Sequence, residues 1–333
     1  MNRAMVLGAT GFIGGHVARA ALAEGWSVTG VRRRPDSVGN IGDLPIEWLQ
    51  ADLQEESRLR SAMAGAEVVF HAAGYYPHSS RHVADQVADA VGQTRGVLQA
   101  ARLAGVRRFI YTSSLTTIGR PPADAARLAD ERDHYLPGSV ARSAYYECKY
   151  AMESEVLRAA AAGFPAIVLN PTAVLGPGDV HLTMARILVA LAGGRGLAWF
   201  PAETNVVDVR DCAAAHVAAA LRGRVGERYL IGGHNLTVRD LMQEIAEVCG
   251  VPAPRWRVPV GVIDTLVRFG DLLPGPNQLG NHLRAVHAWQ GYDCAKAASE
   301  LGLAPRPLAE TLQAAIGWLR ATGYLAPHPT MVR

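Results

Sequence analysis

Three glycines separate an apolar segment from a helical segment near the start of the chain, and they constrain its fold more than any other feature. Residues 4–7 are apolar and predict a buried strand, and the helical stretch after the glycines runs to about Ala23. Glycines between a strand and a helix permit a tight turn, close approach of a phosphate to backbone amides, and close packing of helix on strand. The positive end of the helix dipole would then face the phosphates. The pattern predicts a dinucleotide-binding turn made of Gly8, Thr10, Gly11, Phe12, Ile13 and Gly14.

The residues that follow repeat this alternation of short apolar runs and helical stretches. Alternating β and α units with apolar strands predict a parallel sheet that is covered by helices on both faces. The handedness of crossover connections then favours a doubly wound, Rossmann-type α/β fold. Further strands are expected at 27–31, 46–50, 67–71, 108–112 and 166–169, and helices at 55–63 and 84–104.

The alternation loosens after Pro171, where the sequence predicts a smaller, mostly helical lobe that binds the substrate. We therefore expect a dinucleotide-binding domain at 1–170, with a returning segment near 205–232, and a substrate lobe at 171–333. Strands are expected at 205–209 and 228–231, and helices at 238–249, 260–273, 281–289, 296–301 and 308–322.

Composition narrows the functional class. A net charge of +3 on 333 residues is small for a dedicated nucleic-acid binder. The four cysteines include no C-x-x-C pair, so neither a zinc site nor a disulfide framework is indicated. No apolar run reaches the roughly 20 residues of a membrane span, and no secretory signal is found. We expect a cytoplasmic protein that acts on a small molecule.

The end of the second strand bears on which nicotinamide dinucleotide would bind. An acidic residue there would bind a ribose 2′-hydroxyl, whereas an arginine pairs with a 2′-phosphate. The strand runs into Arg32 and Arg33, with no carboxylate before Asp36, which favours NADP over NAD. A solvated basic loop is the alternative. After the third and fourth strands, five residues are placed to meet the adenine or to let the cofactor lie against the backbone: Asp52, Leu53, Ala72, Ala73 and Gly74.

Tyr145 and Lys149 are four residues apart, which places them on one face of a helix. A neighbouring ammonium group favours the phenolate and lowers the pKa of a tyrosine from its usual value of about 10. The pair therefore predicts an acid/base couple if a redox cofactor and a carbonyl lie beside it. The spacing alone occurs on many helices, so its weight depends on the neighbouring motifs.

Taken together, the motifs of the chain resemble those of an extended short-chain dehydrogenase/reductase. In chain order they are the glycine turn, Ala51-Asp-Leu53, His71-Ala-Ala73, Tyr111-Thr-Ser-Ser114, Tyr145-x-x-x-Lys149 and Asn170-Pro-Thr-Ala-Val-Leu-Gly-Pro177. The likeness covers nearly the whole chain. It points to the NAD-dependent epimerase/dehydratase family, in the dihydroflavonol-reductase-like branch that includes the hopanoid-associated sugar epimerases.

This resemblance implies a role for each matching residue. Tyr145 would be the general acid/base, Lys149 would hold the nicotinamide ribose and depress the Tyr145 pKa, and Ser114 would hydrogen-bond the substrate oxygen. Three residues would lie near the nicotinamide: Pro171, Thr172 and Val174. The resemblance also implies a homodimer formed through the helix at 84–104 and the Tyr145 helix, although the family includes monomers.

Local rivals exist for two of these roles. Ser113 and Thr116 compete for the role of Ser114, and Tyr146 and Tyr150 compete for that of Tyr145. The chain also departs from the family pattern: Ala90 stands where asparagine is usual, and Cys148 where serine is usual. Arginines that sugar-nucleotide members carry near the positions of Ala173 and Thr204 are missing, which disfavours a nucleotide diphosphate as the substrate.

Several other sequence features give weaker evidence about function. Tyr75 and Tyr76 follow the turn after the fourth strand and are candidates for the substrate pocket, with a surface aromatic loop as the alternative. His78 and His82 could meet on one helix face, but no third ligand is evident, so no metal site is predicted. The run 130–133 is expected to form a solvated loop, and Trp256 is expected in the core.

We therefore expect an NAD(P)-dependent oxidoreductase that interconverts a carbonyl and an alcohol on a small, partly apolar substrate. The alternative is a sugar-nucleotide epimerase or dehydratase with tightly bound NAD. A non-catalytic dinucleotide-sensing protein is a third hypothesis, disfavoured because such relatives typically lose the tyrosine or the lysine, and this chain keeps Tyr145 and Lys149.

Overall fold

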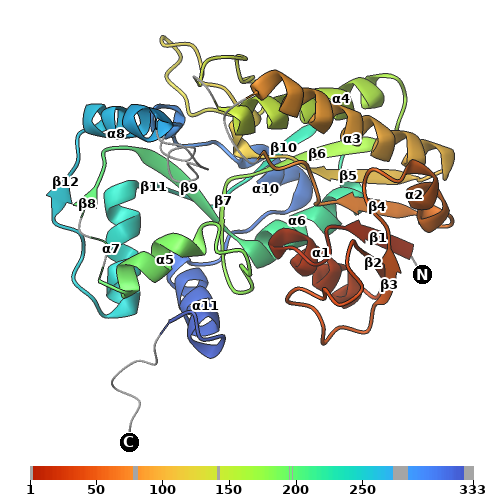
Figure 1. Ribbon diagram of the computed structural model, residues 1–333, viewed down its shortest axis with the longest axis horizontal. Coiled ribbons are helices and arrows are strands. Elements are labelled where there is room, and N and C mark those ends of the chain that lie inside the picture. The colour runs from red at the N-terminus through yellow and green to blue at the C-terminus, as the bar shows by residue number, and fades with distance from the viewer. Residues whose placement is uncertain are drawn as a thin grey trace, which may run out of the picture.

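A seven-stranded sheet forms the centre of the protein (Figure 1). The computed structural model describes residues 3–77, 82–140, 143–194, 196, 198–272 and 284–325, and of residues 268 and 270–272 the backbone alone. The strand order is β3-β2-β1-β4-β5-β6-β10, and every neighbouring pair is parallel. The strands are β1 (Arg3–Leu7), β2 (Ser27–Arg32), β3 (Glu47–Gln50), β4 (Val68–His71), β5 (Arg108–Thr112), β6 (Ala166–Pro171) and β10 (Arg228–Ile231).

The sheet is doubly wound, as predicted. From β1 the chain adds β2 and β3 on one side and then returns to add β4, β5 and β6 on the other. All residues of β4 and β6 are buried, as expected for parallel strands covered on both faces. In such folds ligands bind where the strand order reverses, outside the carboxyl ends of the strands. Here that point lies between β1 and β4.

Helices cover both faces of the sheet and bury two separate cores. On one face α1 (Phe12–Ala23) packs against α6 (Val209–Arg222), with Phe70 and Ile110 beneath them. On the other face lie α2 (Glu56–Met63), α3 (Val83–Leu103) and α4 (Ala144–Ala161), which pack on the opposite sides of the same strands. Helix α4 is the element that carries the Tyr145–Lys149 pair.

A second region, at the left and lower left of Figure 1, contains most of the chain that follows β6. Its core is a three-stranded sheet in the order β11-β9-β7, with a two-stranded pair β12-β8 beside it. The elements of this region are β7 (Ala173–Leu175), α5 (Ala185–Ala192), β8 (Ala198–Trp199), β9 (Glu203–Asp208), β11 (His234–Thr237), α7 (Val238–Cys249), β12 (Trp256–Arg257), α8 (Val260–Leu272) and α11 (Leu308–Ala321). Helix α10 (Ala295–Leu301) instead packs against α6 and β10 of the main sheet. This helical C-terminal portion agrees with the predicted fold class.

The chain crosses between the two regions more than once. After β6 it enters the second region, and it then returns through α6 and β10 to complete the parallel sheet. β10 pairs with β6 in the register Arg228↔Val168, so it forms the edge of the main sheet. The neighbouring β9 instead pairs with β7 and β11 in the smaller sheet.

Three local expectations differ from the structure. Of the helix expected at 281–289, residues 281–283 lie outside the described residues, and the rest holds only the 3-10 turn Val286–Ala288. The carbonyls of His287 and Trp289 accept hydrogen bonds from Arg120, and these bonds replace those of a continuing helix. Trp256 is 73% exposed rather than part of the core, because it lies on the short β12 strand.

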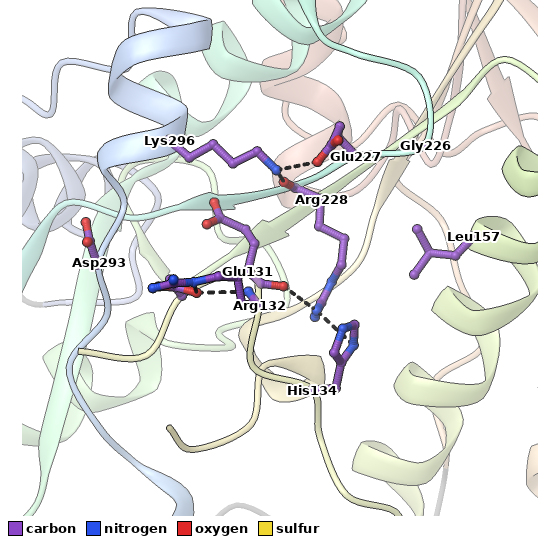
Figure 2. Close-up of a pocket in the computed structure, with 10 residues that line it drawn as sticks. Glu131, Arg132, His134, Leu157, Gly226, Glu227, Arg228, Asp293 and Lys296 are labelled. Atoms are coloured by element: carbon purple, nitrogen blue, oxygen red, sulfur yellow. Dashed lines mark hydrogen bonds and ion pairs between the residues drawn. The ribbon is translucent and has the colours of Figure 1, made fainter. Parts of the chain in front are cut away.

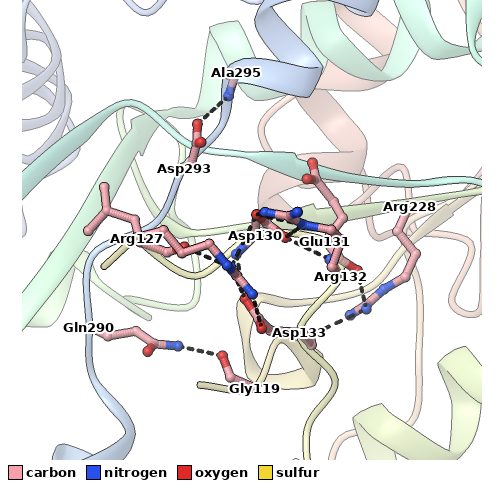
Figure 3. Close-up of polar contacts among 11 residues, drawn as sticks. Gly119, Arg127, Asp130, Glu131, Arg132, Asp133, Arg228, Gln290, Asp293 and Ala295 are labelled. Carbon is pink, nitrogen blue, oxygen red and sulfur yellow. Dashed lines mark hydrogen bonds and ion pairs between the residues drawn. The ribbon is translucent and has the colours of Figure 1, made fainter. Parts of the chain in front are cut away.

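The expected solvated loop at 130–133 is in fact partly buried: Asp130 and Asp133 are buried, whereas Arg132 is exposed. Asp133 pairs with Arg127 at 2.6 Å, and Asp130 pairs with Arg132 at 2.6 Å (Figure 3). Asp133 also accepts a hydrogen bond from the backbone N–H of Asp130 at 3.0 Å. A buried carboxylate needs hydrogen-bond or ion-pair partners. Here Arg127, Arg132 and a backbone amide of the same loop provide them, so the charged segment is ordered.

Candidate active site

The glycine turn is built by backbone packed against backbone. Gly8 has a φ of +87°, and a Cβ atom there would lie 2.8 Å from the Ala73 nitrogen. A Cβ atom at Gly14 would lie 2.1 Å from the Gly8 carbonyl oxygen. The α1 helix begins after Gly11 with no side-chain cap and no acidic residue in its first turn. Its first amide groups are therefore open to an anion, and the turn fits the pyrophosphate of a dinucleotide.

The basic residues after β2 lie at the same edge of the sheet. The register Leu7↔Val31 places Arg32 level with Gly8. The Arg32 guanidinium stacks over the Trp48 ring, 5.0 Å from its centroid, and Arg33 is exposed. Asp52 and Leu53 follow β3 at this edge. The edge therefore carries two arginine side chains where an NAD-binding site would carry a carboxylate.

Helix α4 presents Tyr145 and Lys149 toward the end of the sheet. Ser143 caps the helix by accepting a hydrogen bond from the Tyr146 N–H. The Lys149 Nζ atom lies 5.9 Å from the centroid of the Tyr145 ring, as the four-residue spacing predicts. A Cβ atom at Gly74 would lie 3.8 Å from the same Nζ. Lys149 thus faces the small residues after β4 as well as Tyr145.

Ser114 meets Tyr145 from the end of β5. Its hydroxyl hydrogen-bonds the Tyr145 phenol and accepts a hydrogen bond from the Thr116 N–H at 3.2 Å. The hydroxyl of the rival Ser113 donates instead to Glu153, away from the phenol. The Thr116 hydroxyl oxygen is buried without a hydrogen-bond partner among the described residues. Ser114, rather than Ser113, therefore lies with Tyr145 and Lys149.

Burial dominates the protonation of this group of side chains. It raises the pKa of Tyr145, and the hydrogen bond from Ser114 offsets only part of that effect. Burial also lowers the pKa of Lys149 to about 8, against an opposing effect of the Glu153 carboxylate. Desolvation of the phenolate therefore leaves the pKa of Tyr145 raised in this structure, and the expectation that Lys149 depresses it stays a prediction.

Of the other residues predicted from the sequence, some lie at the site and others are buried in the core. The Tyr76 ring lies 5.1 Å from the Tyr145 ring and is 54% exposed, whereas Tyr75 packs against the core beneath α3 and α4. Thr172, directly after β6, hydrogen-bonds the Ile231 carbonyl through its N–H at 3.0 Å and is buried, as is Val174. His78 lies outside the described residues.

A cavity of about 780 Å³ lies beside Ser114 and Tyr145. Its wall includes Leu115, which follows Ser114, and Tyr146, which follows Tyr145. Tyr146 packs in one apolar cluster with Tyr135 and Val140, and Tyr145 packs against that cluster. The other lining side chains come from loops and from α8: Ile118, Arg120, His134, Leu136, Ser139, Asp264, Val267, Arg284, His287, Ala288, Gln290 and Tyr292. No local sequence pattern predicted this wall, because its segments are far apart in the chain.

A second cavity, of about 450 Å³, lies at the β10 edge of the sheet (Figure 2). Its lining is strongly charged, but these charges are paired: Lys296 bonds Glu227 at 2.7 Å, and Arg132 bonds Asp130. None of Ser114, Tyr145 and Lys149 is among the lining residues of either cavity. The larger cavity is lined by Leu115 and Tyr146, the chain neighbours of Ser114 and Tyr145, and is the nearer of the two by that criterion.

Three buried residues beneath the site were not foreseen as functional: Glu153, Asn170 and Arg228. Glu153 lies one further turn along the same face of α4 as Tyr145 and Lys149, and Asn170 and Arg228 both contact its carboxylate. The four-residue spacing of Glu153 from Lys149 was the available signal. No local sequence pattern predicts that Glu153 pairs with Arg228, which lies on a strand much later in the chain.

Among the described residues, no helix is both long enough and apolar enough to cross a bilayer.

The doubly wound sheet, the glycine turn and the Ser114–Tyr145–Lys149 group define a dinucleotide-binding enzyme of the extended short-chain dehydrogenase/reductase class. The model of the NAD dependent epimerase/dehydratase family matches residues 4–232, and the chain belongs to that family. The expected family, enzymatic nature and nicotinamide dinucleotide cofactor are thereby confirmed.

Relatives within this family differ in their named reactions. A Synechocystis sp. protein provisionally named dihydroflavonol 4-reductase is 31% identical over 96% of this chain and 95% of its own. A solved nucleoside-diphosphate-sugar epimerase from Pseudomonas aeruginosa is 30% identical, covers 97% of this chain and 99% of its own, and superposes with a TM-score of 0.83. A dTDP-glucose 4,6-dehydratase from Streptomyces venezuelae, solved with NAD bound, has the same fold at 21% identity, with a TM-score of 0.76 over 98% of this chain and 99% of its own.

Proposed function

We propose that the protein is an NADP-preferring oxidoreductase that interconverts a carbonyl and an alcohol on a small, partly apolar molecule. The observation that carries this proposal is the contact of Ser114 with Tyr145 near a cavity of mixed apolar, aromatic and polar lining, with Lys149 on the same helix face. The glycine turn and the small residues after β4 would hold the dinucleotide. The bound nicotinamide would supply the hydride in reduction and accept it in oxidation.

The side chains of the site have complementary roles in this reaction. Burial raises the pKa of Tyr145, so its phenol is protonated at neutral pH and is ready to donate a proton to a carbonyl oxygen. Ser114 would donate a hydrogen bond to the same oxygen and hold it against the phenol. Lys149 would bind the ribose hydroxyls through its ammonium group. A protonated Tyr145 is the form that carbonyl reduction requires.

The preference for NADP rests on the end of β2. Arg32 and Arg33 follow this strand level with the glycine turn, and no carboxylate is present before Asp36. A guanidinium group can form two parallel hydrogen bonds to a phosphate. Arg32 is already oriented by its stacking on Trp48. NAD would lack the 2′-phosphate that these side chains are placed to bind.

The nature of the larger cavity supports an apolar substrate. Three tyrosines, Tyr135, Tyr146 and Tyr292, line it together with aliphatic side chains, although polar and charged side chains such as Arg120 and Asp264 are also present. Its volume of about 780 Å³ falls within the usual range of sites for small molecules. Aromatic walls favour a substrate that carries a ring or an extended apolar body.

A sugar-nucleotide epimerase is the second candidate, because the solved epimerase from Pseudomonas aeruginosa is 30% identical to this chain. The two candidates differ in cofactor turnover. A panel of ketones and aldehydes, screened by the absorbance of NADPH, should reveal net oxidation of free cofactor. Tightly held NAD, with conversion of a sugar nucleotide and no net turnover of free cofactor, would contradict the oxidoreductase proposal.

The resemblance to the family also leads us to propose a homodimer through α3 and α4, which sedimentation would test.

A further inference from the structure

A buried glutamate lies one helical turn beyond Lys149 on α4. Tyr145, Lys149 and Glu153 succeed one another at intervals of four residues, so all three occupy one face of the helix. The Glu153 Oε2 atom accepts hydrogen bonds from Thr117 Oγ1 at 2.7 Å, from Asn170 Nδ2 at 2.6 Å, and from Ser113 Oγ. Glu153 is only 3% exposed and its carboxylate is occupied by these protein donors, so it lies beneath the site rather than against a substrate.

The partners of Glu153 are also the groups that hold Ser114. Asn170 Nδ2 lies 3.2 Å from the Ser114 carbonyl oxygen and donates to it. The Thr117 hydroxyl, which has one proton, lies within donor distance of both that carbonyl, at 3.0 Å, and the Glu153 carboxylate. The Ser114 hydroxyl in turn meets the Tyr145 phenol. The position of Ser114 therefore depends on where the Glu153 carboxylate holds these donors.

Arg228 fixes the carboxylate from the other side. It extends from β10, and its Nε atom lies 2.8 Å from Glu153 Oε1, with only 5% and 4% of the two side chains exposed. Its Nη1 atom donates to the Glu131 carbonyl at 3.0 Å and its Nη2 atom to the Thr117 carbonyl at 2.9 Å. Figures 2 and 3 show this guanidinium reaching from its strand to the loop at 131–134. Removing either partner would leave a buried charge uncompensated.

We infer that Glu153 and Arg228 are positioning residues of the active site: together they fix the Ser114 hydroxyl against the Tyr145 phenol and place a negative charge one turn from the Lys149 ammonium. The inference rests on the proposed roles of Ser114, Tyr145 and Lys149. It extends the site to two residues that touch neither cofactor nor substrate.

The charges around Lys149 support this role. Cys148 and Glu153 face it from α4, His71 faces it from β4, and Arg228 lies beyond Glu153. Burial lowers the pKa of Lys149, and Glu153 opposes that effect. Burial and the Lys149 charge lower the pKa of His71 to about 3, so the imidazole is neutral near pH 7. Among these groups Glu153 has the largest effect in favour of the protonated lysine, and Cys148 adds a smaller one.

A second buried glutamate on the same helix provides a matched control. The carboxylate of Glu155 binds Arg95 through two hydrogen bonds of 3.0 Å and also contacts Arg158. Its side chain is 9% exposed. Arg95 lies on α3, and neither arginine contacts Ser114 or Tyr145 in the hydrogen bonds of the structure. A Glu155→Gln change thus removes a largely buried charge without touching the donors that hold Ser114.

The test compares Glu153→Gln, Glu155→Gln and the unchanged enzyme. We expect Glu153→Gln to lower kcat by about 10- to 100-fold, the scale of a misplaced catalytic group, with little change in the KM for NADPH. The alkaline limb of kcat/KM should move to lower pH because Lys149 loses a favourable charge. Glu153→Asp should restore part of kcat. Glu155→Gln should change thermal stability only.

Equal kcat values and equal pH limbs for Glu153→Gln and Glu155→Gln would overturn the inference and leave Glu153 with a structural role alone. If Glu153→Gln does not fold, Glu153→Asp and Arg228→Lys decide the matter by the same kinetics, because both keep the charge and change only the geometry. A readout that needs no turnover separates this inference from the proposed function. The ¹³Cζ resonance of Tyr145, assigned with Tyr145→Phe, should move in the Glu153 or Arg228 variant and stay in place in Glu155→Gln, even if no carbonyl proves to be a substrate.

Discussion

The cofactor side and the substrate side of Tyr145 are built from different parts of the polypeptide. On the cofactor side the surface is backbone, and Gly8 and Gly14 have no room for a Cβ atom. On the proposed substrate side the surface consists of side chains from α4, from α8 and from the segments 115–140 and 284–292. A surface of backbone restricts each position to a residue type, whereas a surface of side chains can change without altering the fold. We propose that the first determines the reaction class and the second determines the substrate.

The largest loss of activity is expected at Tyr145, where the cofactor side and the substrate side meet. Tyr145→Phe keeps the ring but removes the proton that reduction requires, so kcat should fall by about 10²- to 10⁴-fold. NADPH binding, measured by fluorescence titration, should change little. Tyr146→Phe is the matched control, since Tyr146 lines the cavity but is not the partner of Ser114. A similar loss in both variants would contradict the assignment of the acid to Tyr145.

A methyl group at Gly14 should disrupt the cofactor side directly. Its Cβ atom would lie 2.1 Å from the Gly8 carbonyl oxygen, so the turn must shift. Gly14→Ala should lower the free energy of unfolding by about 1–3 kcal/mol and weaken NADPH binding, as measured by denaturant unfolding and by titration. Gly92→Ala in α3 has open space around its Cβ position and should instead be stabilising, by about 0.5–1 kcal/mol. Unchanged NADPH binding in Gly14→Ala would place the cofactor elsewhere.

The pH dependence of kcat/KM tests the role of Lys149 on the cofactor side. Burial lowers the pKa of Lys149 to about 8, and its ammonium form is the one that binds the ribose. The value of kcat/KM should therefore fall about tenfold per pH unit above that pKa, rather than above the usual value of about 10.4. Lys149→Arg stays charged throughout this range and should lose the alkaline limb, even though its activity is lower. An unchanged limb would assign the ionisation to another group.

A smaller effect is expected for the choice between the two dinucleotides. Replacing both Arg32 and Arg33 with alanine should raise the KM for NADP relative to that for NAD by about tenfold, equivalent to about 1.4 kcal/mol. Steady-state kinetics with both cofactors give this ratio. Arg60→Ala, which removes an exposed charge on α2, is the control. Equal changes for NADP and NAD would remove the preference for NADP.

The smallest change in kinetics is expected for a residue on the proposed substrate side. Leu136 lines the larger cavity and is 71% exposed in the structure. The KM for a substrate that partly covers this side chain should rise a few-fold in Leu136→Ala, below the tenfold or greater effect of the about 1.5–3 kcal/mol that a fully buried leucine contributes. The KM for NADPH should be unchanged. A change in the cofactor KM alone would show that this wall does not face the substrate.

The sequence predicted the parts of the site that depend on local pattern. The glycine spacing located the turn, and the four-residue spacing placed Tyr145 and Lys149 together, because a strand–turn–helix unit and a helix face are defined by adjacent residues. The pKa of Tyr145 could not be predicted, since it depends on burial by distant elements. The pairing of Glu153 with Arg228 was equally out of reach, because it joins a helix to a strand that enters the sheet much later in the chain.

The late position of β10 has a consequence for synthesis on the ribosome. Until residues 228–231 emerge, β6 is an unpaired edge of the parallel sheet, and such edges favour pairing with other chains. During the same interval Glu153 lacks its guanidinium partner. A nascent chain that ends at residue 170 would contain Tyr145, Lys149 and the glycine turn but would expose that edge. If Arg228 acts as inferred, the active site is complete only after β10 has emerged, although Tyr145 and the glycine turn are made early.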